Sequence, residues 1–190
     1  MKVKAFSASV MFVLAVGACG DRGEPPATSD TSAASADAGT SGAIPAPELE
    51  AAARDVIAFL RGELPFDEIE VADSVTLFVA PEGGGTRSAF AREQLRDASS
   101  WVVTSPEGRR SLVPLTGLDS MTMRVGRHLN CMEYPLSTRF AELAALPHVG
   151  VKLERAGDGN CLQTWNLTLV FDSTARPPRL VAAVYDQWEW

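Results

Sequence analysis

The stretch that decides the fold is residues 149–190, which read VGVKLERAGDGNCLQTWNLTLVFDSTARPPRLVAAVYDQWEW. Three runs within it, at 149–154, 162–171 and 180–190, are rich in β-branched and apolar residues, and turn-forming residues separate them. Short runs of this kind, bounded by Gly, Pro, Asn and Asp, are typical of β-strands. We therefore expect the chain to end in an antiparallel meander.

The residues before this stretch predict helices first and then further strands. Apolar residues recur at helical spacing through Leu49, Ala53, Val56 and Leu60, which predicts a helix over Pro47–Arg61. The other elements that we expect are a strand over 73–80, a helix over 88–98, strands over 101–104, 111–113 and 121–125, and a short helix over 138–146. Helices followed by mostly antiparallel strands indicate an α+β fold.

This order of elements, helix, strand, helix and then sheet, resembles that of the NTF2-like cone and, less closely, that of cystatin-like folds. The resemblance implies N-terminal helices packed on a mostly antiparallel, curved sheet. It also implies that a ligand would bind on the concave face of that sheet.

The N-terminus has the features of a secretory signal peptide. Two lysines lie within Met1–Lys4, and an apolar run follows from Ala5 to Val16. This run is shorter than the roughly 20 residues that a helix needs to cross a bilayer. We therefore expect residues 1–18 to be cleaved rather than to remain as a membrane span.

The end of this run, Val16-Gly17-Ala18-Cys19, resembles the lipobox of bacterial lipoproteins. The resemblance implies cleavage before Cys19 and attachment of lipid to its sulfur, which would anchor the protein to the cell envelope. The alternative is an ordinary secretory signal followed by a chance cysteine. Because Gly20 follows Cys19, where inner-membrane lipoproteins of enteric bacteria carry Asp, the outer membrane facing the periplasm is the favoured location.

Composition divides the mature chain into a tether and one domain. Residues 19–46 are dominated by Ala, Ser, Thr, Gly, Asp and Pro, which predicts a disordered tether, and residues 47–190 form the expected α+β domain. Cleavage of the signal peptide leaves 15 basic and 24 acidic residues, a net charge of −9. This surplus argues against nucleic acid as a partner and against electrostatic adhesion to anionic lipid.

Two cysteines remain after the lipidated one, and in an exported domain such a pair predicts a disulfide. A bond between Cys131 and Cys161 would close a 31-residue loop and contribute about 3.6 kcal/mol in the chain-entropy model. The alternative is a zinc site formed by both cysteines with His128 and His148. The spacing of the cysteines is not that of a zinc knuckle, so we expect neither a metal nor another cofactor.

The last strand and the Gly-rich segment supply the candidate ligand-binding residues. Alternation places Asp186 and Trp188 on one face of the strand, and Trp165 could join them from its neighbour to form an aromatic-walled pocket. Ordinary core packing is nevertheless the favoured interpretation for these rings. Arg87, beside the glycines at 83–85, could hold a carboxylate or phosphate on free backbone N–H groups, although a flexible connector is the favoured interpretation of this segment.

No catalytic motif is present, so the sequence favours a non-catalytic domain that binds a ligand or a protein in the envelope. The alternative is an envelope hydrolase that uses His128 or His148 with a carboxylate. A third hypothesis is a structural assembly subunit, which predicts a large exposed apolar patch. A histidine within hydrogen-bond reach of a carboxylate in a wet cleft would favour the enzyme.

Overall fold

The computed structural model describes residues 43–80, 86–105, 108–130, 134–156 and 164–186. These residues form a long α-helix, α1 (Ala46–Leu60), a short one, α2 (Ala141–Ala144), and two β-sheets. Short 3-10 helices connect them, namely η1 (Phe66–Glu68), η2 (Arg92–Leu95), η3 (Ala98–Ser100) and η4 (Leu136–Thr138). None of the helices in these ranges is both long enough and apolar enough to cross a membrane.

The main sheet has six strands in the order β2-β1-β8-β7-β6-β5. Their bounds are β1 Val71–Ala80, β2 Thr86–Ala91, β5 Ser120–Val125, β6 His148–Glu154, β7 Trp165–Phe171 and β8 Leu180–Asp186. All neighbouring pairs are antiparallel except β1 and β8, which are parallel. A separate hairpin joins β3 (Val102–Ser105) to β4 (Gly108–Ser111).

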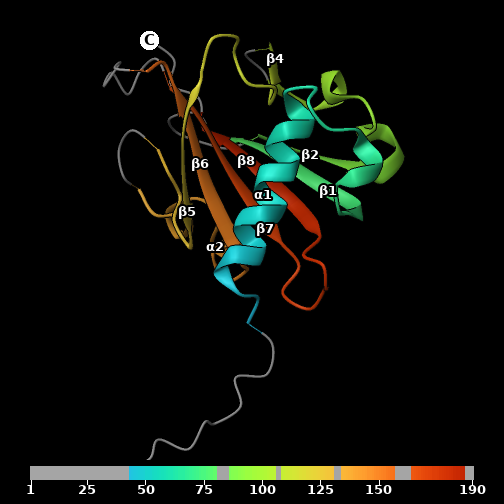
Figure 1. The fold of residues 1–190 in the computed structure, drawn as a ribbon, viewed down its shortest axis with the longest axis vertical. Coiled ribbons are helices and arrows are strands. Elements are labelled where there is room, and N and C mark those ends of the chain that lie inside the picture. Colours follow the sequence, from blue (N-terminus) through green and yellow to red (C-terminus); the bar gives the residue numbers. More distant parts are fainter. Residues whose placement is uncertain (1–42, 81–85, 106–107, 131–133, 157–163, 187–190) are drawn as a thin grey trace, which may run out of the picture. The chain divides into compact units, whose positions relative to one another are not determined.

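Helix α1 covers one face of this sheet (Figure 1). Its apolar residues Leu49, Val56 and Leu60 are buried in one cluster with alternate residues of the strands. On β7, for example, the alternate residues Trp165, Leu167, Leu169 and Phe171 all belong to this cluster. Burial of apolar side chains at about 25 cal/mol per Å² makes this contact the main stabilising feature of the domain.

The opposite face of the sheet has an apolar half and a polar half. The apolar half is covered by η4 and α2 through a second cluster, Phe78, Ala80, Leu136, Phe140, Leu143, Val170, Ala182 and Val184. The polar half lies over β5, β6, β7 and β8, where three polar residues are buried: Asn166, Thr168 and Asp186. Buried polar groups need partners, so this half of the face is where a functional site is expected.

The structure confirms the α+β class and a mostly antiparallel sheet. The first helix and the strands expected over 73–80, 101–104, 121–125 and 149–154 are present, whereas the strand expected over 111–113 lies instead at Gly108–Ser111. The parallel pairing of β1 with β8 was not anticipated, because it joins segments about a hundred residues apart in the chain. The NTF2-like or cystatin-like curved cone stays a prediction.

The helix predicted over 88–98 is wrong. Residues Thr86–Ala91 form β2, which pairs antiparallel with β1, and only Arg92–Leu95 turns into a 3-10 helix. The apolar residues Ala91, Leu95 and Ala98 suggested helical spacing, but a six-residue ladder with β1 outweighs this weak local preference. Leu95 is still buried, and its carbonyl accepts a hydrogen bond from the ring nitrogen of buried Trp101 at 3.0 Å.

The core of the domain includes a residue that precedes Pro47. Ile44, which the composition assigned to the tether, is 8% exposed and belongs to the core beneath α1. At the other end, β8 is described as far as Asp186, and the residues after it lie outside the described ranges. The domain boundary therefore includes at least one apolar residue before Pro47.

Tyr185 gives a testable pH dependence. Its ring lies 6.1 Å from that of Trp165 on the α1 face, and burial raises its pKa above the ordinary value of 10.0, with Arg110 opposing and Asp186 adding to the shift. Because the neutral phenol is favoured in the folded state, its contribution to stability is present below about pH 10 and is lost as the pH rises through the folded-state pKa. We expect the variant Tyr185→Phe to lose less stability than the wild type between about pH 8 and about pH 11, measured by urea unfolding at both values.

Candidate functional site

Cross-strand pairing brings polar residues from distant segments into one row on the sheet. Lys152 of β6 lies opposite Asn166 of β7, which in turn lies opposite Asp186 of β8. In the next row on the same face, Gly150 lies opposite Thr168. Because alternate residues of a strand share a face, this arrangement collects amide, hydroxyl, ammonium and carboxylate groups in one place.

The loop that follows β5, residues 126–130, crosses directly over β6 at Gly150. A Cβ atom added at Gly150 would lie 2.4 Å from the carbonyl oxygen of Arg127 and 2.9 Å from the backbone nitrogen of Leu129. Only glycine permits this approach of backbone to backbone. Gly150 therefore sets the height of the loop above the sheet and, with it, the position of His128.

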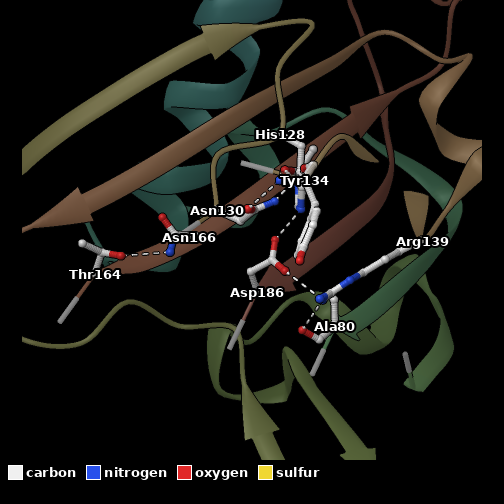
Figure 2. A network of polar contacts seen from close by, with 9 residues as sticks. Ala80, His128, Asn130, Tyr134, Arg139, Thr164, Asn166 and Asp186 are labelled. Atoms are coloured by element: carbon white, nitrogen blue, oxygen red, sulfur yellow. Dashed lines mark hydrogen bonds and ion pairs between the residues drawn. The ribbon is translucent and has the colours of Figure 1, made fainter. Parts of the chain in front are cut away.

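His128 is inserted from this loop into the polar half of the sheet face (Figure 2). Its Nδ1 lies 2.6 Å from the hydroxyl oxygen of Thr168, and its Nε2 lies 2.5 Å from Oδ2 of Asp186. The side chains of His128 and Asp186 are only 3% and 4% exposed. Both ring nitrogens are thus engaged within the protein, in a place closed to solvent.

Arg139, which follows η4, completes the network on the far side of Asp186 (Figure 2). Its Nη1 lies 3.6 Å from the carboxylate oxygen Oδ1 and donates a hydrogen bond of 3.0 Å to the carbonyl of Ala80. The guanidinium also lies 5.9 Å from the centre of the Tyr134 ring. One buried carboxylate therefore holds together the loop after β5, the end of β1 and the segment that carries η4.

The ends of the 131–133 segment are held by a reciprocal pair of hydrogen bonds. The side-chain amide of Asn130 donates to the carbonyl of Tyr134 at 2.8 Å, and its oxygen accepts from the backbone N–H of Tyr134 at 3.1 Å. Asn130 thereby fixes the chain on the C-terminal side of His128.

Two cavities have His128 in their lining. One, of about 550 Å³, is lined by Arg124, Arg127, His128, Leu129, Asn130, Lys152 and Asn166. The other, of about 300 Å³, is lined by residues that include His128, Tyr134 and His148. The first combines three cationic side chains with two amides, so it is suited to a polar, negatively charged ligand.

The structure confirms core packing for Trp165, and Trp165 and Asp186 do not form an aromatic pocket together. Trp165 is fully buried in the core under α1, whereas Asp186 faces His128 on the opposite side of the sheet. Asn166, the neighbour of Trp165, is the residue paired with Asp186, so alternation separates the two side chains. Trp188, the third member of the predicted pocket, lies outside the described residues.

Arg87 lies on β2, away from the polar network. It is exposed and lines a cavity of about 560 Å³ together with Phe78 of β1 and Leu143 of α2. The glycines at 83–85, on which the predicted anion site depended, lie outside the described residues. Cys19, Cys131 and Cys161 lie outside them as well, so lipidation and the disulfide stay predictions.

The two histidines differ in their surroundings. The Nδ1 of His148 donates to the carbonyl of Leu146 at 2.8 Å, whereas His128 has the carboxylate partner described above. Within the part of the chain that the structure describes, no group of three or more His, Cys, Asp or Glu residues is placed to hold a metal ion.

Thr168, Arg139 and Gly150 were not identified from the sequence, nor were the cavity-lining residues Arg124, Arg127, Lys152 and Asn166. Gly150 offered the one available signal, because a glycine inside a strand pattern often marks a close approach of another backbone. Comparison of the chain with family models, with curated proteins and with solved structures gave no match.

Proposed function

We propose that the protein is a lipid-anchored lipoprotein of the bacterial envelope whose domain binds a ligand or another protein and does not catalyse a reaction. The lipobox-like sequence ending at Cys19 supports the anchor. The observation that carries the non-catalytic function is the burial of the His128–Asp186 pair, whose side chains are both less than 5% exposed.

A hydrolase that uses His128 is the second candidate, and the 2.5 Å contact between His128 and Asp186 is the observation that favours it. In a Ser/Thr–His–Asp hydrolase, one ring nitrogen of the histidine contacts the carboxylate, and the other accepts the proton of a hydroxyl group that must itself reach the substrate. Asp186 occupies one nitrogen of His128, and Thr168, which is fully buried, occupies the other. The arrangement therefore supports a structural cross-link better than it supports proton transfer.

A structural assembly subunit has less support. In the described part of the chain, the exposed large apolar side chains are Leu115, Met121 and Tyr134, and they come from three separate segments. A protein that assembles through this domain would be expected to expose a contiguous apolar patch instead.

The anchor is tested by expressing the full chain and the variant Cys19→Ser in a bacterium and partitioning each between detergent and aqueous phases. We expect the wild type to enter the detergent phase and to carry acyl chains by mass spectrometry, and Cys19→Ser to carry none. Cys131→Ser serves as the control, because it removes a different cysteine and leaves the acylation unchanged. A wild-type protein with an unmodified Cys19 would contradict the proposal.

The predicted disulfide has its own test. We expect peptide mapping of the exported protein without reductant to recover Cys131 and Cys161 as one cross-linked pair. The double variant Cys131→Ser/Cys161→Ser should then lose about 3.6 kcal/mol of unfolding free energy, measured in urea. Recovery of both cysteines as free thiols would contradict the pairing.

A further inference from the structure

We propose that the cavity lined by Arg124, Arg127 and Lys152 binds a small hydroxylated anion, namely a carboxylate or phosphate group carried on a molecule with hydroxyl groups. This inference rests on the proposed binding function and assigns its site and ligand class.

Positive charge is concentrated in the lining of this cavity. Arg124 comes from β5, Arg127 from the loop and Lys152 from β6, and all three line one cavity of a chain whose net charge is −7. Glu154, 2.7 Å from Lys152, offsets the charge of that lysine. No ion pair in the described ranges offsets Arg124 or Arg127, and these two like charges repel one another unless a counter-charge is supplied. An anionic ligand would supply it.

The two arginines keep donors available for a ligand, whereas Lys152 is already paired with Glu154. Arg127 is exposed and has no hydrogen bond or ion pair to any residue in the described ranges. Arg124 uses Nη1 to donate to the carbonyl of Met123, which leaves its other donors for a ligand. Lys152 contacts Glu154 at 2.7 Å, and this carboxylate is not part of the cavity lining.

The shape of the cavity is fixed before any ligand binds. Two of the cations project from paired strands of the sheet, and the loop that carries the third is fixed by its passage over Gly150 and by the contacts of His128. A preorganised site spends less of its binding energy on ordering. The buried network next to the cavity is thus a support for the site.

The side chain of Asn166 also lines the cavity. Its Nδ2 donates to the hydroxyl of Thr164 at 2.9 Å, whereas its buried Oδ1 has no partner in the described part of the chain. An unsatisfied buried polar atom costs about 1–3 kcal/mol, so we expect the amide to turn toward a ligand that can satisfy it. A hydroxyl group donates and accepts, and therefore suits either orientation of the amide.

Size and charge point to a small soluble molecule. A volume of about 550 Å³ falls within the range of small-molecule pockets, about 300–1,000 Å³. The net negative charge of the chain disfavours an extended anionic surface such as a membrane, whereas a single anionic group is matched by the local cluster.

The test is isothermal titration calorimetry of the purified full chain in a non-ionic detergent. The probes are D-glucuronate and D-glucose 6-phosphate, compared with D-glucose, which lacks the charge, and with cyclohexanecarboxylate, which lacks the hydroxyl groups. We expect at least one of the two hydroxylated anions to bind at least tenfold more tightly than both comparison compounds. Failure of both anions to bind, or equal binding of D-glucose, would overturn the proposal.

Variants locate the site. We expect Arg127→Ala to weaken the binding of the anion at least tenfold without changing the melting temperature, because Arg127 has no partner in the described structure. Arg54→Ala is the matched control, because Arg54 is exposed on α1 and α1 covers the other face of the sheet. Equal losses from both variants would overturn the assignment. Such a result would leave the lipid anchor intact, because the detergent partition of Cys19→Ser tests the anchor separately.

Discussion

Asp186→Ala is expected to lower the free energy of unfolding by about 3–5 kcal/mol, because it removes the buried carboxylate that contacts both His128 and Arg139. Asp186 contacts His128 at 2.5 Å and Arg139 at 3.6 Å, so its loss leaves a buried imidazole and a partly buried guanidinium without their shared partner. Urea unfolding of the wild type and the variant at the same pH measures the difference.

The matched control for this prediction is Asp67→Ala. The Nη1 of Arg96 lies 2.9 Å from Oδ1 of Asp67, but both side chains are largely exposed. Exposed ion pairs contribute about 0–1 kcal/mol, so this variant should unfold almost as the wild type does. If Asp186→Ala and Asp67→Ala had the same small effect, the network around Asp186 would not be a stabilising feature of the fold.

The variant Gly150→Ala is expected to lower the free energy of unfolding by about 3 kcal/mol, near the upper end of the cost of overpacking a close contact. The added methyl group would lie 2.4 Å from a backbone oxygen of the crossing loop, and backbone cannot move aside as the end of a side chain can. The loop must rise from the sheet, which draws His128 away from Thr168 and Asp186.

Two further variants separate the causes of this effect. Leu129→Ala combined with Gly150→Ala removes the side-chain overlap at 2.9 Å but not the overlap with the carbonyl of Arg127, so we expect no recovery of stability. Gly117→Ala changes a glycine with a φ of +78° and no neighbour within 4 Å, so it tests conformational strain alone, about 1–2 kcal/mol. Only Gly150→Ala should shift the ring resonances of His128 in an NMR spectrum, and unchanged resonances would contradict this account of the loop.

The sequence predicted most of the elements but not the contacts between them. Strand and helix periodicity identified α1 and most of the strands of the main sheet, because their apolar residues repeat locally. The helix expected over 88–98 failed because pairing with β1, a non-local contact, determined the structure of β2. The same limit explains why the parallel pairing of β1 with β8 was not anticipated.

The candidate site could be predicted only in part. His128 was considered as a residue that needs a carboxylate, and Asp186 was considered as a ligand-binding acid, but nothing in their spacing indicated that they meet. Their contact depends on the loop crossing Gly150 and on the register of β7 with β8. Core packing, the favoured interpretation for Trp165, is confirmed, because its face of β7 packs under α1.

If His128 is a buried structural cross-link that supports a binding cavity, its ring is protected from chemical modification. Measuring that protection tests this role most directly. The chain has two histidines, so diethyl pyrocarbonate followed by peptide mass spectrometry reports on each of them separately. We predict that His148, which keeps one ring nitrogen free of a partner in the described structure, is modified at least tenfold faster than His128, whose two ring nitrogens are engaged. Modification of His128 at the same rate as His148 would contradict the claim and favour an accessible, catalytic histidine.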